Sequence, residues 1–387
     1  MRLGDCGKTN LHTYSDKEKW SLIRYLDTGS ITEGRIDEIQ TLYPGVDKIP
    51  SRARRKASVG DILFSTVRPN QKHYGIIEAG TENLLVSTGF TVVTVDTTIV
   101  DPYFIYYYLT QSSVIESLQA IAEQSTSTYP SIKPSDIEDI ELDLPELETQ
   151  KKIGSTLRML DRKIALNEEI NDNLYAQAKA IFDNHFINID AIPAGWRKGN
   201  LLDIANYLNG LAMQKFRPQG HEIGLPVLKI KELRQGSCDD SSELCSLSIK
   251  PEYIIHNGDV VFSWSGSLLV DIWCGGTCGL NQHLFKVTSD VYDKWFYYLW
   301  TAHHLARFIA IAADKATTMG HIKREELAKA EVLIPCEEDY TSFNSIMQPI
   351  FELIISNRIE SRKLAALRDE LLPKLMTGEI DVSDVQF

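Results

Sequence analysis

One pattern occurs twice in this 387-residue chain, over residues 106–182 and again over residues 296–372. Leu299 lies 190 positions after Leu109, and Pro335 lies 190 positions after Pro145. Each copy passes through an aromatic cluster, a Ser/Thr-rich stretch, a strand-like run ending in proline and a long helical segment. Solenoid units recur about every 20–50 residues, so a period of 190 is domain-sized. The sequence therefore predicts a tandem duplication of one module.

Each copy ends in a long amphipathic segment. Apolar residues recur at steps of three and four over residues 146–185, which contain no proline, and this spacing predicts one long helix. A matching helix is expected over Phe343 to Leu371. A helix of about 39 residues spans roughly 58 Å at a rise of about 1.5 Å per residue. Because an exposed apolar stripe of that length promotes aggregation, we expect the two helices to pack on each other.

One polar position interrupts both apolar stripes, and it is the same position in the repeat: Asn167 and Asn357. A single Asn in a helix seam lowers stability but specifies register, because its side chain needs a hydrogen-bonding partner across the interface. With an antiparallel helix pair, the two Asn side chains are expected near the axis that relates the repeats. The alternative is that both face solvent on a slightly rotated stripe.

The segments before the long helices have the pattern of mixed α/β modules. Strands are predicted at residues 61–65 and 90–95, and the run Gly258-Asp-Val-Val-Phe-Ser matches Gly60-Asp-Ile-Leu-Phe-Ser. An aromatic-rich helix is predicted over residues 103–118 and an alternating strand over residues 140–145. The predicted fold class is mixed α/β (α+β) with an internal pseudo-twofold repeat. The predicted domains are residues 1–145, a first module; 146–185, a long helix; 186–335, a second module; and 336–387, a long helix and tail.

The composition limits the protein class. A net charge of −13 excludes a protein that holds nucleic acid by bulk positive charge, but basic clusters remain at residues 52–56, 68–72 and 229–234. The sequence contains no run of 18 or more apolar residues, the length that would indicate a membrane span. The first ten residues lack the apolar core of a secretory signal. With scattered cysteines, these features predict a cytoplasmic protein that has no contact with a membrane.

The sequence lacks the common catalytic and metal-binding motifs, which favours a non-catalytic chain. Cys274-x3-Cys278, with Cys238 and His283 nearby, is a poor zinc pattern because paired two-residue spacings are missing. Asp101-Pro-Tyr-Phe104 is weakly similar to an amino-methyltransferase motif, but no Gly-rich cofactor loop stands upstream. The ATP-binding, zinc-protease and serine-hydrolase motifs are also missing. We therefore predict no catalytic residue, no metal site and no cofactor in this chain.

The order of these features resembles the specificity subunit of type I restriction-modification systems. The resemblance covers nearly the whole chain, and the residues that carry it are Ile192-Pro-Ala-Gly-Trp-Arg-Lys-Gly-Asn-Leu-Leu-Asp-Ile204, both Gly-Asp-(Ile/Val)-(Leu/Val)-Phe-Ser runs, Lys315-Ala-Thr-Thr-Met-Gly-His-Ile-Lys323 and Leu371-Leu-Pro-Lys-Leu-Met-Thr-Gly-Glu-Ile380. The N-terminus departs from this pattern, since a module opening like the one around Trp196 is missing or degenerate before Asp5.

The resemblance implies separate roles for the two modules, the two long helices and the partner subunits. Each module would be a target recognition domain that reads half of a split sequence in double-stranded DNA. The two helices would form an antiparallel coiled coil that sets the distance between the half-sites. They would also dock two methyltransferase (modification) subunits and help to recruit the restriction subunit. S-adenosylmethionine, and ATP with Mg, would be bound in those partner subunits.

Candidate DNA-binding residues are polar and basic side chains on loops, because such groups reach base edges and phosphates. In the first module these are Arg54, Arg55, Lys56, Arg68, Asn70, Gln71, Lys72, His73, Ser127, Thr128 and Lys133. In the second module they are Lys215, Arg217, Trp264, Ser265, Asn281, Gln282, His283, Thr317, Thr318, His321 and Lys323. Asn281 and Gln282 have amides suited to bidentate contact with adenine. The alternative for residues 125–133 is a Ser/Thr-rich turn that caps a helix at Ser135.

Two other functional classes remain at this stage. A stand-alone DNA methyltransferase or nuclease would bind S-adenosylmethionine or metal by itself, and the missing motifs disfavour it. A coiled-coil scaffold that binds peptides would show no salt-dependent DNA affinity even in its assembled complex. The aromatic clusters at residues 103–108 and 295–300 are expected to pack in the core rather than to stack on bases, because their spacing is helical.

Overall fold

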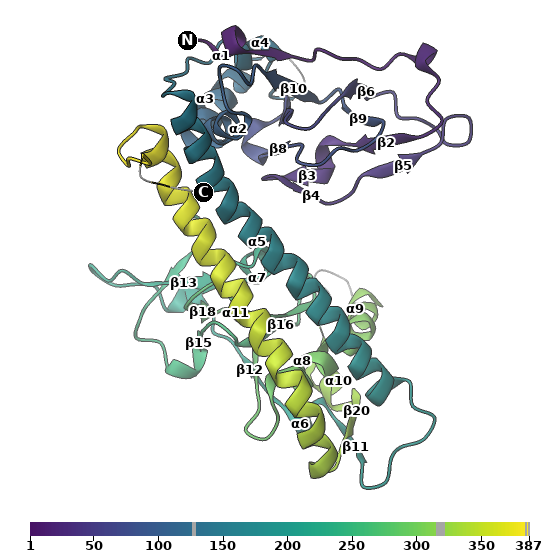
Figure 1. Cartoon of the computed structure of the whole chain (residues 1–387). Helices are drawn as coiled ribbons and strands as arrows, with labels where there is room; N and C mark the ends of the chain where they lie inside the picture. Colours follow the sequence, from purple (N-terminus) through teal and green to yellow (C-terminus); the bar gives the residue numbers. More distant parts are fainter. Residues whose placement is uncertain (126–128, 315–321, 384, 386–387) are drawn as a thin grey trace. The chain divides into compact units, whose positions relative to one another are not determined.

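The chain folds into two compact units (Figure 1). The computed structural model describes residues 1–387 except 126–128, 315–321, 384 and 386–387. The first unit consists of Met1–Arg162 and Ala365–Phe387, and the second of Lys163–Leu364. The boundary between the units falls inside both long helices, α5 (Leu147–Phe182) and α11 (Glu337–Met376), and the division of the chain into four domains stays a prediction.

The first unit contains two four-stranded sheets. One has the order β1-β10-β7-β8, and its neighbouring strands are all antiparallel. These strands are Gly7–Thr9, Phe90–Val95, Ile62–Ser65 and Tyr74–Ile76. The other sheet has the order β5-β2-β9-β6, in which β2 and β9 are parallel. These strands are Gln40–Leu42, Ile23–Leu26, Leu84–Ser87 and Ala53–Lys56. A short hairpin joins β3 (Ile31–Thr32) to β4 (Arg35–Ile36).

The second unit repeats the strand order and directions of both four-stranded sheets. Its sheets have the orders β12-β19-β16-β17 and β14-β13-β18-β15, and β13 and β18 form the parallel pair. The strands of the first sheet are Asn206–Asn209, Leu284–Thr288, Val260–Ser263 and Leu269–Ile272. Those of the second are Leu244–Cys245, Leu225–Leu228, Cys278–Leu280 and Ile254–Ile255. The predicted mixed α/β fold with an internal repeat is confirmed.

The two Gly-Asp runs make the same turn in the two units. Gly60 and Gly258 have φ values of +89° and +87°, in the left-handed region that favours glycine. The following aspartate then accepts a backbone hydrogen bond from the residue three positions before it. Asp61 accepts from Ser58 at 2.7 Å, and Asp259 accepts from His256 at 2.8 Å. The turn leads directly into the buried strands β7 and β16, so the shared motif has a local structural cause.

Helices cover the sheets in both units. In the first unit they are α1 (Leu3–Cys6), α2 (Pro102–Thr110), α3 (Ser112–Glu123) and α4 (Pro134–Glu138). In the second they are α6 (Leu201–Ile204), α7 (Ile230–Gln235), α8 (Lys294–His303), α9 (Leu305–Asp314) and α10 (Arg324–Ala328). The aromatic residues of α2 and α8 are largely buried, among them Phe104, Trp295 and Trp300, so core packing is the better interpretation of both clusters.

Three features expected from the sequence differ in the structure. The helix expected over residues 103–118 is broken at Gln111, whose extended backbone begins α3. Polar residues next to the break, Thr110 and Ser112, compete for backbone hydrogen bonds and so favour helix ends. The expected cap at Ser135 is also displaced, because α4 begins at Pro134 with Lys133 as its N-cap residue. The Asp136 carboxylate accepts the Lys133 backbone N–H at 2.6 Å.

The strand expected over residues 140–145 is reduced to a single bridge between Glu141 and Arg2. Met1 and Leu3 add backbone hydrogen bonds on either side of it, with Leu142 and Ile140. The corresponding strand of the second unit, β20 (Glu331–Ile334), pairs over four residues with β11 (Arg197–Asn200).

Each long helix is attached to the aromatic-rich helix of its unit, α2 or α8, by a hydrogen bond of the same kind. Gln150 of α5 accepts the backbone N–H of Asp101, the N-cap residue of α2, at 3.0 Å. Tyr340 of α11 accepts the backbone N–H of Asp293, the N-cap residue of α8, at 2.6 Å. In the first unit Gly154 allows close approach, since a Cβ there would lie 2.6 Å from Asp101 Oδ1.

The two long helices run antiparallel in the second unit, where both Asn side chains are buried at their interface. Asn167 is fully buried and donates to Glu360 at 2.7 Å and to Ser361 at 3.2 Å. Asn357 is 8% exposed and donates to Asn171 at 3.0 Å. Hydrogen bonding by Asn167 lowers the pKa of Glu360. The solvent-facing alternative therefore does not hold, and a role in helix register stays a prediction.

Each unit also takes core residues from the helix that starts in the other unit. Ala178, Phe182 and the following Phe186 belong to the hydrophobic core of the second unit. Leu372 and Leu375 of α11 belong to the core of the first, together with Val382 of the tail. Phe182 and Leu372 occupy the same position of the 190-residue repeat, since 372 − 182 = 190. The exchange of helix ends is thus part of the duplication.

Arg358 fastens α11 to the sheet of the second unit. Its guanidinium makes two hydrogen bonds to the Asp271 carboxylate, at 2.9 and 2.7 Å, and a third to the Ile272 carbonyl at 2.8 Å. The side chains of the two ions are 30% and 24% exposed. Bidentate pairing of this kind restricts the guanidinium plane and so the orientation of the helix face.

Replacing Arg358 with Met should lower the unfolding free energy of the second unit by about 2–3 kcal/mol, because Asp271 would be left largely buried without its partner. Urea unfolding, followed by the fluorescence of the second unit's tryptophans, measures the change in midpoint. The matched control is Arg162→Met, since Arg162 is 63% exposed and lies 3.8 Å from Glu78; it should change stability by less than about 0.5 kcal/mol. Equal effects of the two substitutions would contradict the anchoring role.

Candidate nucleic-acid interface

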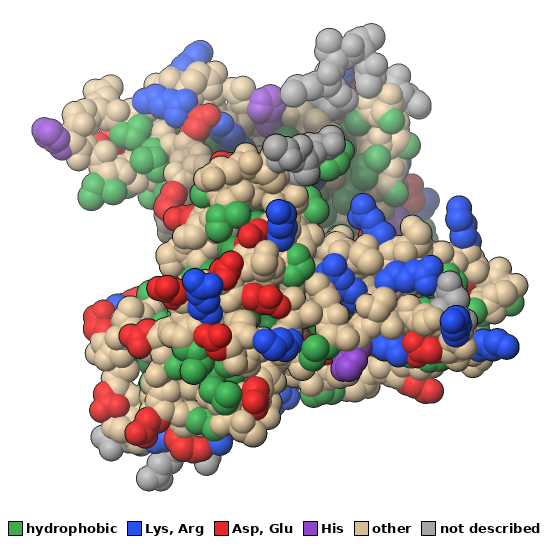
Figure 2. All heavy atoms as spheres, turned by 90° about the horizontal axis from the view of Figure 1, so that it is seen from above, with side chains coloured by type: hydrophobic (Ala, Val, Ile, Leu, Met, Phe, Trp, Pro, Cys, Tyr) green, Lys and Arg blue, Asp and Glu red, His purple; other side chains and the backbone are tan. Residues whose placement is uncertain are grey.

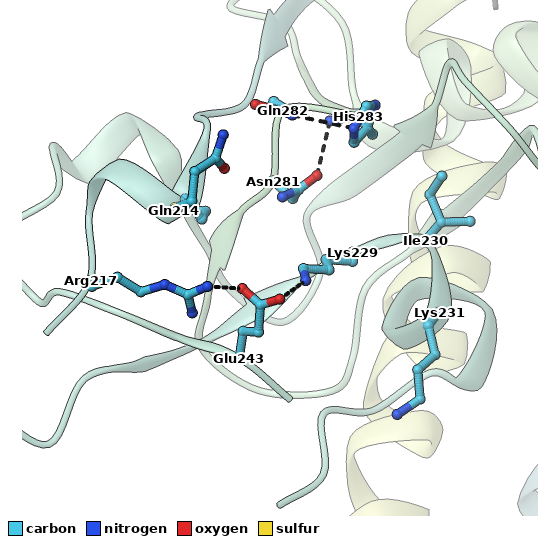
Figure 3. Close-up of a pocket in the computed structure, with 10 residues that line it drawn as sticks. Gln214, Arg217, Lys229, Ile230, Lys231, Glu243, Asn281, Gln282 and His283 are labelled. Carbon is cyan, nitrogen blue, oxygen red and sulfur yellow. Dashed lines mark hydrogen bonds and ion pairs between the residues drawn. The ribbon is translucent and has the colours of Figure 1, made fainter. Parts of the chain in front are cut away.

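The second unit has a cavity of about 440 Å³ with polar and basic walls (Figure 3). Four segments form it: the η5 turn (Met213–Lys215) with the residues after it, the junction of β13 and α7, the residue before β14, and the turn between β18 and β19. The lining residues are Met213, Gln214, Arg217, Lys229, Ile230, Lys231, Glu243, Asn281, Gln282 and His283.

The turn between β18 and β19 is held by its own backbone. The N–H groups of Asn281 and Gln282 donate to the carbonyls of Leu228 and Leu211, at 3.2 and 2.9 Å. The His283 N–H donates to the Asn281 side-chain oxygen at 3.2 Å, and the Leu284 N–H closes the turn on the Asn281 carbonyl at 3.0 Å. With four consecutive N–H groups bonded, the turn presents the side chains at 282 and 283 from a rigid base.

Gly210 lets a neighbouring strand end reach this turn. A Cβ at position 210 would lie 2.5 Å from the carbonyl oxygen of Leu280 and closer still to that of Asn281. Both contacts are with backbone atoms, which have little freedom to move. The absence of a side chain at Gly210 is therefore what allows Leu211 to bridge to Asn281 and to hold Gln282.

A chain of polar contacts runs from the strand β16 end to the cavity. Ser265 Oγ lies 2.9 Å from His283 Nδ1, and His283 Nε2 lies 3.3 Å from Gln282 Nε2. Trp264 stands beside this chain, with its ring centroid 6.2 Å from that of His283. Its indole N–H donates to Asn209 at 2.9 Å. The predicted residues Trp264, Ser265, Asn281, Gln282 and His283 are therefore brought together by the fold.

Two cations in the cavity share one carboxylate. Glu243 accepts hydrogen bonds from Lys229 and from Arg217, and the Arg217–Glu243 distance is 2.6 Å. The hydrogen bond from Lys229 is the main reason that the pKa of Glu243 is lowered. Lys231, at the start of α7, pairs instead with Asp239 at 3.3 Å outside the cavity lining. The cavity thus holds basic groups close to amide groups, with Glu243 between the two cations (Figure 3).

Basic side chains continue along α7. A second hollow, of about 490 Å³, is lined by Ile230, Lys231, Arg234, Gln235 and Ser267. The face seen in Figure 2 likewise has Lys and Arg gathered over some stretches and Asp and Glu over others. The negative net charge of the chain is therefore compatible with local basic surfaces, which are what contact with phosphates requires.

Other predicted residues of the second unit lie outside the cavity lining. Lys215 is exposed on η5, one residue beyond Gln214. Lys323 is exposed as the N-cap residue of α10. Thr317, Thr318 and His321 lie outside the described residues.

The predicted residues of the first unit fall into separate groups. Arg54, Arg55 and Lys56 lie on β6, where burial lowers the pKa of the Arg55 guanidinium. Lys56 pairs with Glu18 at 2.5 Å and lies over the Trp20 ring. These contacts occupy Lys56 within the unit, so a role for it in DNA binding stays a prediction.

The second group follows β7 and includes the η3 turn (Pro69–Gln71). Arg68 and Lys72 have positive φ values of 49° and 57°. The Lys72 ammonium lies 2.5 Å from Glu33, and His73 Nδ1 lies 2.6 Å from the Ile31 carbonyl oxygen. Asn70 and Gln71 are exposed on the turn, and Lys133 is exposed at the start of α4. Ser127 and Thr128 lie outside the described residues.

Sequence reasoning missed four polar residues that line the cavity, Gln214, Lys229, Lys231 and Glu243, as well as the apolar Met213 and Ile230. A signal existed for the two lysines, because residues 229–234 form a basic cluster in the sequence. No sequence signal indicated Glu243, because this isolated glutamate is brought to the cavity by the pairing of β14 with β13.

Among the described residues, no group of three His, Cys, Asp or Glu side chains is placed to hold a metal ion. In the same part of the chain, no helix is both long enough and apolar enough to cross a membrane.

Comparison with known proteins agrees with the fold. Residues 53–176 match the type I restriction modification DNA specificity domain. The chain is 22% identical to the type I restriction enzyme HindI specificity subunit of Haemophilus influenzae, and the match covers 98% of each protein. It is 26% identical to the MjaIX specificity subunit of Methanocaldococcus jannaschii, over 84% of this chain and 79% of that one. The chain thus contains a type I restriction modification DNA specificity domain, and the relatives that it matches over most of its length are type I restriction enzyme specificity subunits.

A solved member of the specificity-subunit family has the same fold. The S subunit of the type I restriction-modification system of M. genitalium aligns with a TM-score of 0.56, over 97% of this chain and 95% of that one. The sequence identity is 14%, so this likeness concerns the fold alone. In the present chain the DNA specificity domain, residues 53–176, begins at β6 and extends into α5.

Replacing Glu243 with Gln should increase DNA affinity at low salt several-fold, because Arg217 and Lys229 lose a competing carboxylate. The slope of log affinity against log salt should become steeper by about 1–2, since each further phosphate contact contributes about 0.9. Fluorescence anisotropy with a labelled duplex over a salt series measures both quantities. The matched control is Glu252→Gln, an exposed glutamate outside the cavity lining; a Glu243→Gln variant that behaves like this control would refute the prediction.

Proposed function

We propose that this chain reads a bipartite target in double-stranded DNA, with one half-site for each unit. By binding methyltransferase and restriction subunits, it would confer that sequence specificity on them. The observation that carries the proposal is the duplication. Two units have the same two-sheet arrangement, and one of them has a cavity with the amides and cations of a base-reading surface. A duplicated reader matches a target with two halves, as half-site spacing follows the geometry of paired readers.

The chemistry of the cavity supports contact with base edges flanked by phosphates. Amide side chains make bidentate hydrogen bonds to bases, and Arg and Lys hold phosphates on either side. Gln214 and Gln282 face the same cavity as Arg217 and Lys229. A peptide-binding scaffold would have no need for this combination of groups.

The remaining parts of the activity are assigned to partners. We propose that the chain itself is non-catalytic and binds no cofactor. S-adenosylmethionine would be bound by two modification subunits, and ATP with Mg by the restriction subunit. α5 and α11 are the proposed docking elements, because their outward positions keep apolar residues such as Met159, Ile346 and Leu353 about half exposed. A cytoplasmic location follows from this role, since the DNA and the partner subunits are there.

Co-expression of this chain with a cognate modification subunit should produce a new methylated motif with two short half-sites around a fixed gap. Long-read sequencing detects the motif, and a strain with the modification subunit alone is the control. The subunits should also co-purify. Co-purification without any new methylation would count against the recognition role and favour a scaffold.

Exchange of residues 1–145 for the first module of another family member should change one half-site and leave the other intact. The exchanged module must fit Leu372, Leu375 and Val382, which complete its core from the other end of the chain. The reciprocal exchange of residues 186–335 should change the other half-site. The same sequencing measures both motifs, and retention of both original half-sites after either exchange would refute the modular reading of DNA.

A further inference from the structure

The amide of Gln282 is held in one orientation by a neighbouring histidine. The Gln282 Nε2 group has hydrogens and no lone pair to offer, so at 3.3 Å it donates to His283 Nε2. His283 Nε2 is then unprotonated, which places the ring proton on Nδ1. The Nδ1–H donates to Ser265 Oγ at 2.9 Å. The three side chains form one directed chain of hydrogen bonds from Ser265 to Gln282.

This direction decides what Gln282 presents to the cavity. Because Nε2 is turned toward His283, the carbonyl oxygen Oε1 points away from the ring, as Figure 3 shows. The exposed edge of the amide therefore offers one acceptor, Oε1, beside one remaining N–H donor. Adenine presents the complementary pair in the major groove, an N6 amino donor next to the N7 acceptor. Guanine presents two acceptors there, so its O6 would face Oε1 without a hydrogen between them.

Asn281 has a different role from the one its amide suggested. Its side chain is 6% exposed, and its Oδ1 already accepts the His283 backbone N–H. Asn281 therefore shapes the turn, while Gln282, at its tip, keeps an amide edge toward the cavity. Of the two amides, that of Gln282 is therefore the one that we expect to contact a base.

The surroundings suit a base flanked by its backbone. Arg217 and Lys229 line the same cavity as Gln282, and both are partly exposed. Both pair with Glu243, so a phosphate near the base would compete with that carboxylate for them. Gln282 thus shares its cavity with two cations that can exchange Glu243 for a phosphate.

The first unit lacks the same set of groups. Val67 lies 198 positions before Ser265, after the strand that corresponds to β16. The turn between β9 and β10 contains Thr88 and Gly89, where the second unit has Asn281, Gln282 and His283. The hydrogen-bond chain is therefore a property of the second unit, and it predicts a feature of one half-site only.

We propose that Gln282 is a specificity-determining residue that reads one adenine in the half-site bound by the second unit, with His283 and Ser265 as positioning residues for its amide. The inference rests on the proposed function. It identifies a base, an edge of that base and the side chains that recognise it.

The test uses the full-length chain co-expressed with its modification subunits and a methylome readout, with the second half-site assigned by module exchange. Wild-type chain should give a second half-site with one invariant adenine. Gln282→Ala should reduce discrimination at that position about 10- to 100-fold, the range of a bidentate base contact. Gln282→Glu should move the preference toward cytosine, whose N4 group donates to a carboxylate. The first half-site should stay unchanged in both variants.

The positioning residues are tested by the same readout. His283→Ala and Ser265→Ala should relax the same base position by a smaller factor, while Ser265→Thr, which keeps a hydroxyl, should retain discrimination. The matched control is Gln219→Ala, an exposed glutamine outside the cavity lining, and it should leave every position unchanged.

The outcomes separate this inference from the proposed function. Wild-type chain that gives no split motif would remove the proposed function and the inference with it. A normal wild-type motif that survives Gln282→Ala and Gln282→Glu without change would remove the inference alone. Relaxation of many positions at once, or in both half-sites, would show that Gln282 is structural and would likewise overturn its role as a reader. Thermal unfolding of each variant confirms that the chain compared is folded.

Discussion

The mutual completion of the two hydrophobic cores is the constraint on which the rest of this structure depends. α5 leaves the first unit and contributes Phe182 to the second, and α11 leaves the second unit and contributes Leu372 to the first. Burial of a large apolar side chain is worth about 1.5–3 kcal/mol, so several such residues form a substantial part of each unit's stability. Asn167 and Asn357 add polar contacts along the same helices, where hydrogen bonds depend on a particular register.

On this shared framework the two units differ where loops meet the sheets. Strand order, the Gly-Asp turns and the attachment of each long helix to an aromatic helix are the same in both. The turn that carries Gln282 and His283 has a short Thr-Gly counterpart in the first unit. A duplicated framework with divergent loops allows two different sequences to be read without changing the core, since loops tolerate substitution far better than packed strands.

Repeats and periodicity were enough to predict the duplicated α/β fold and the long helices, because both leave a mark on every matched position. The break at Gln111 escaped detection, since its cause is local competition for backbone hydrogen bonds within an apolar run. The site was predicted in part. Gln282 and Ser265 stood out as polar residues next to strands, but Glu243 precedes a strand that is distant in the sequence, and no pattern indicated that Asn281 is buried. Pairing of distant segments and burial are tertiary properties, which spacing in one sequence does not reveal.

The exchanged helix ends have a consequence for synthesis on the ribosome. Residues 1–162 of the first unit emerge long before Leu372, Leu375 and Val382, which close its core. At about 5–20 residues per second, the remaining 220 residues from 162 to 382 take roughly 10–45 seconds to appear. During this interval the apolar surface that these residues cover stays exposed, and exposed apolar surface of this kind is prone to aggregation. The usual N-to-C order of domain folding therefore does not apply here, because the first unit is completed only after all residues of the second have been synthesised.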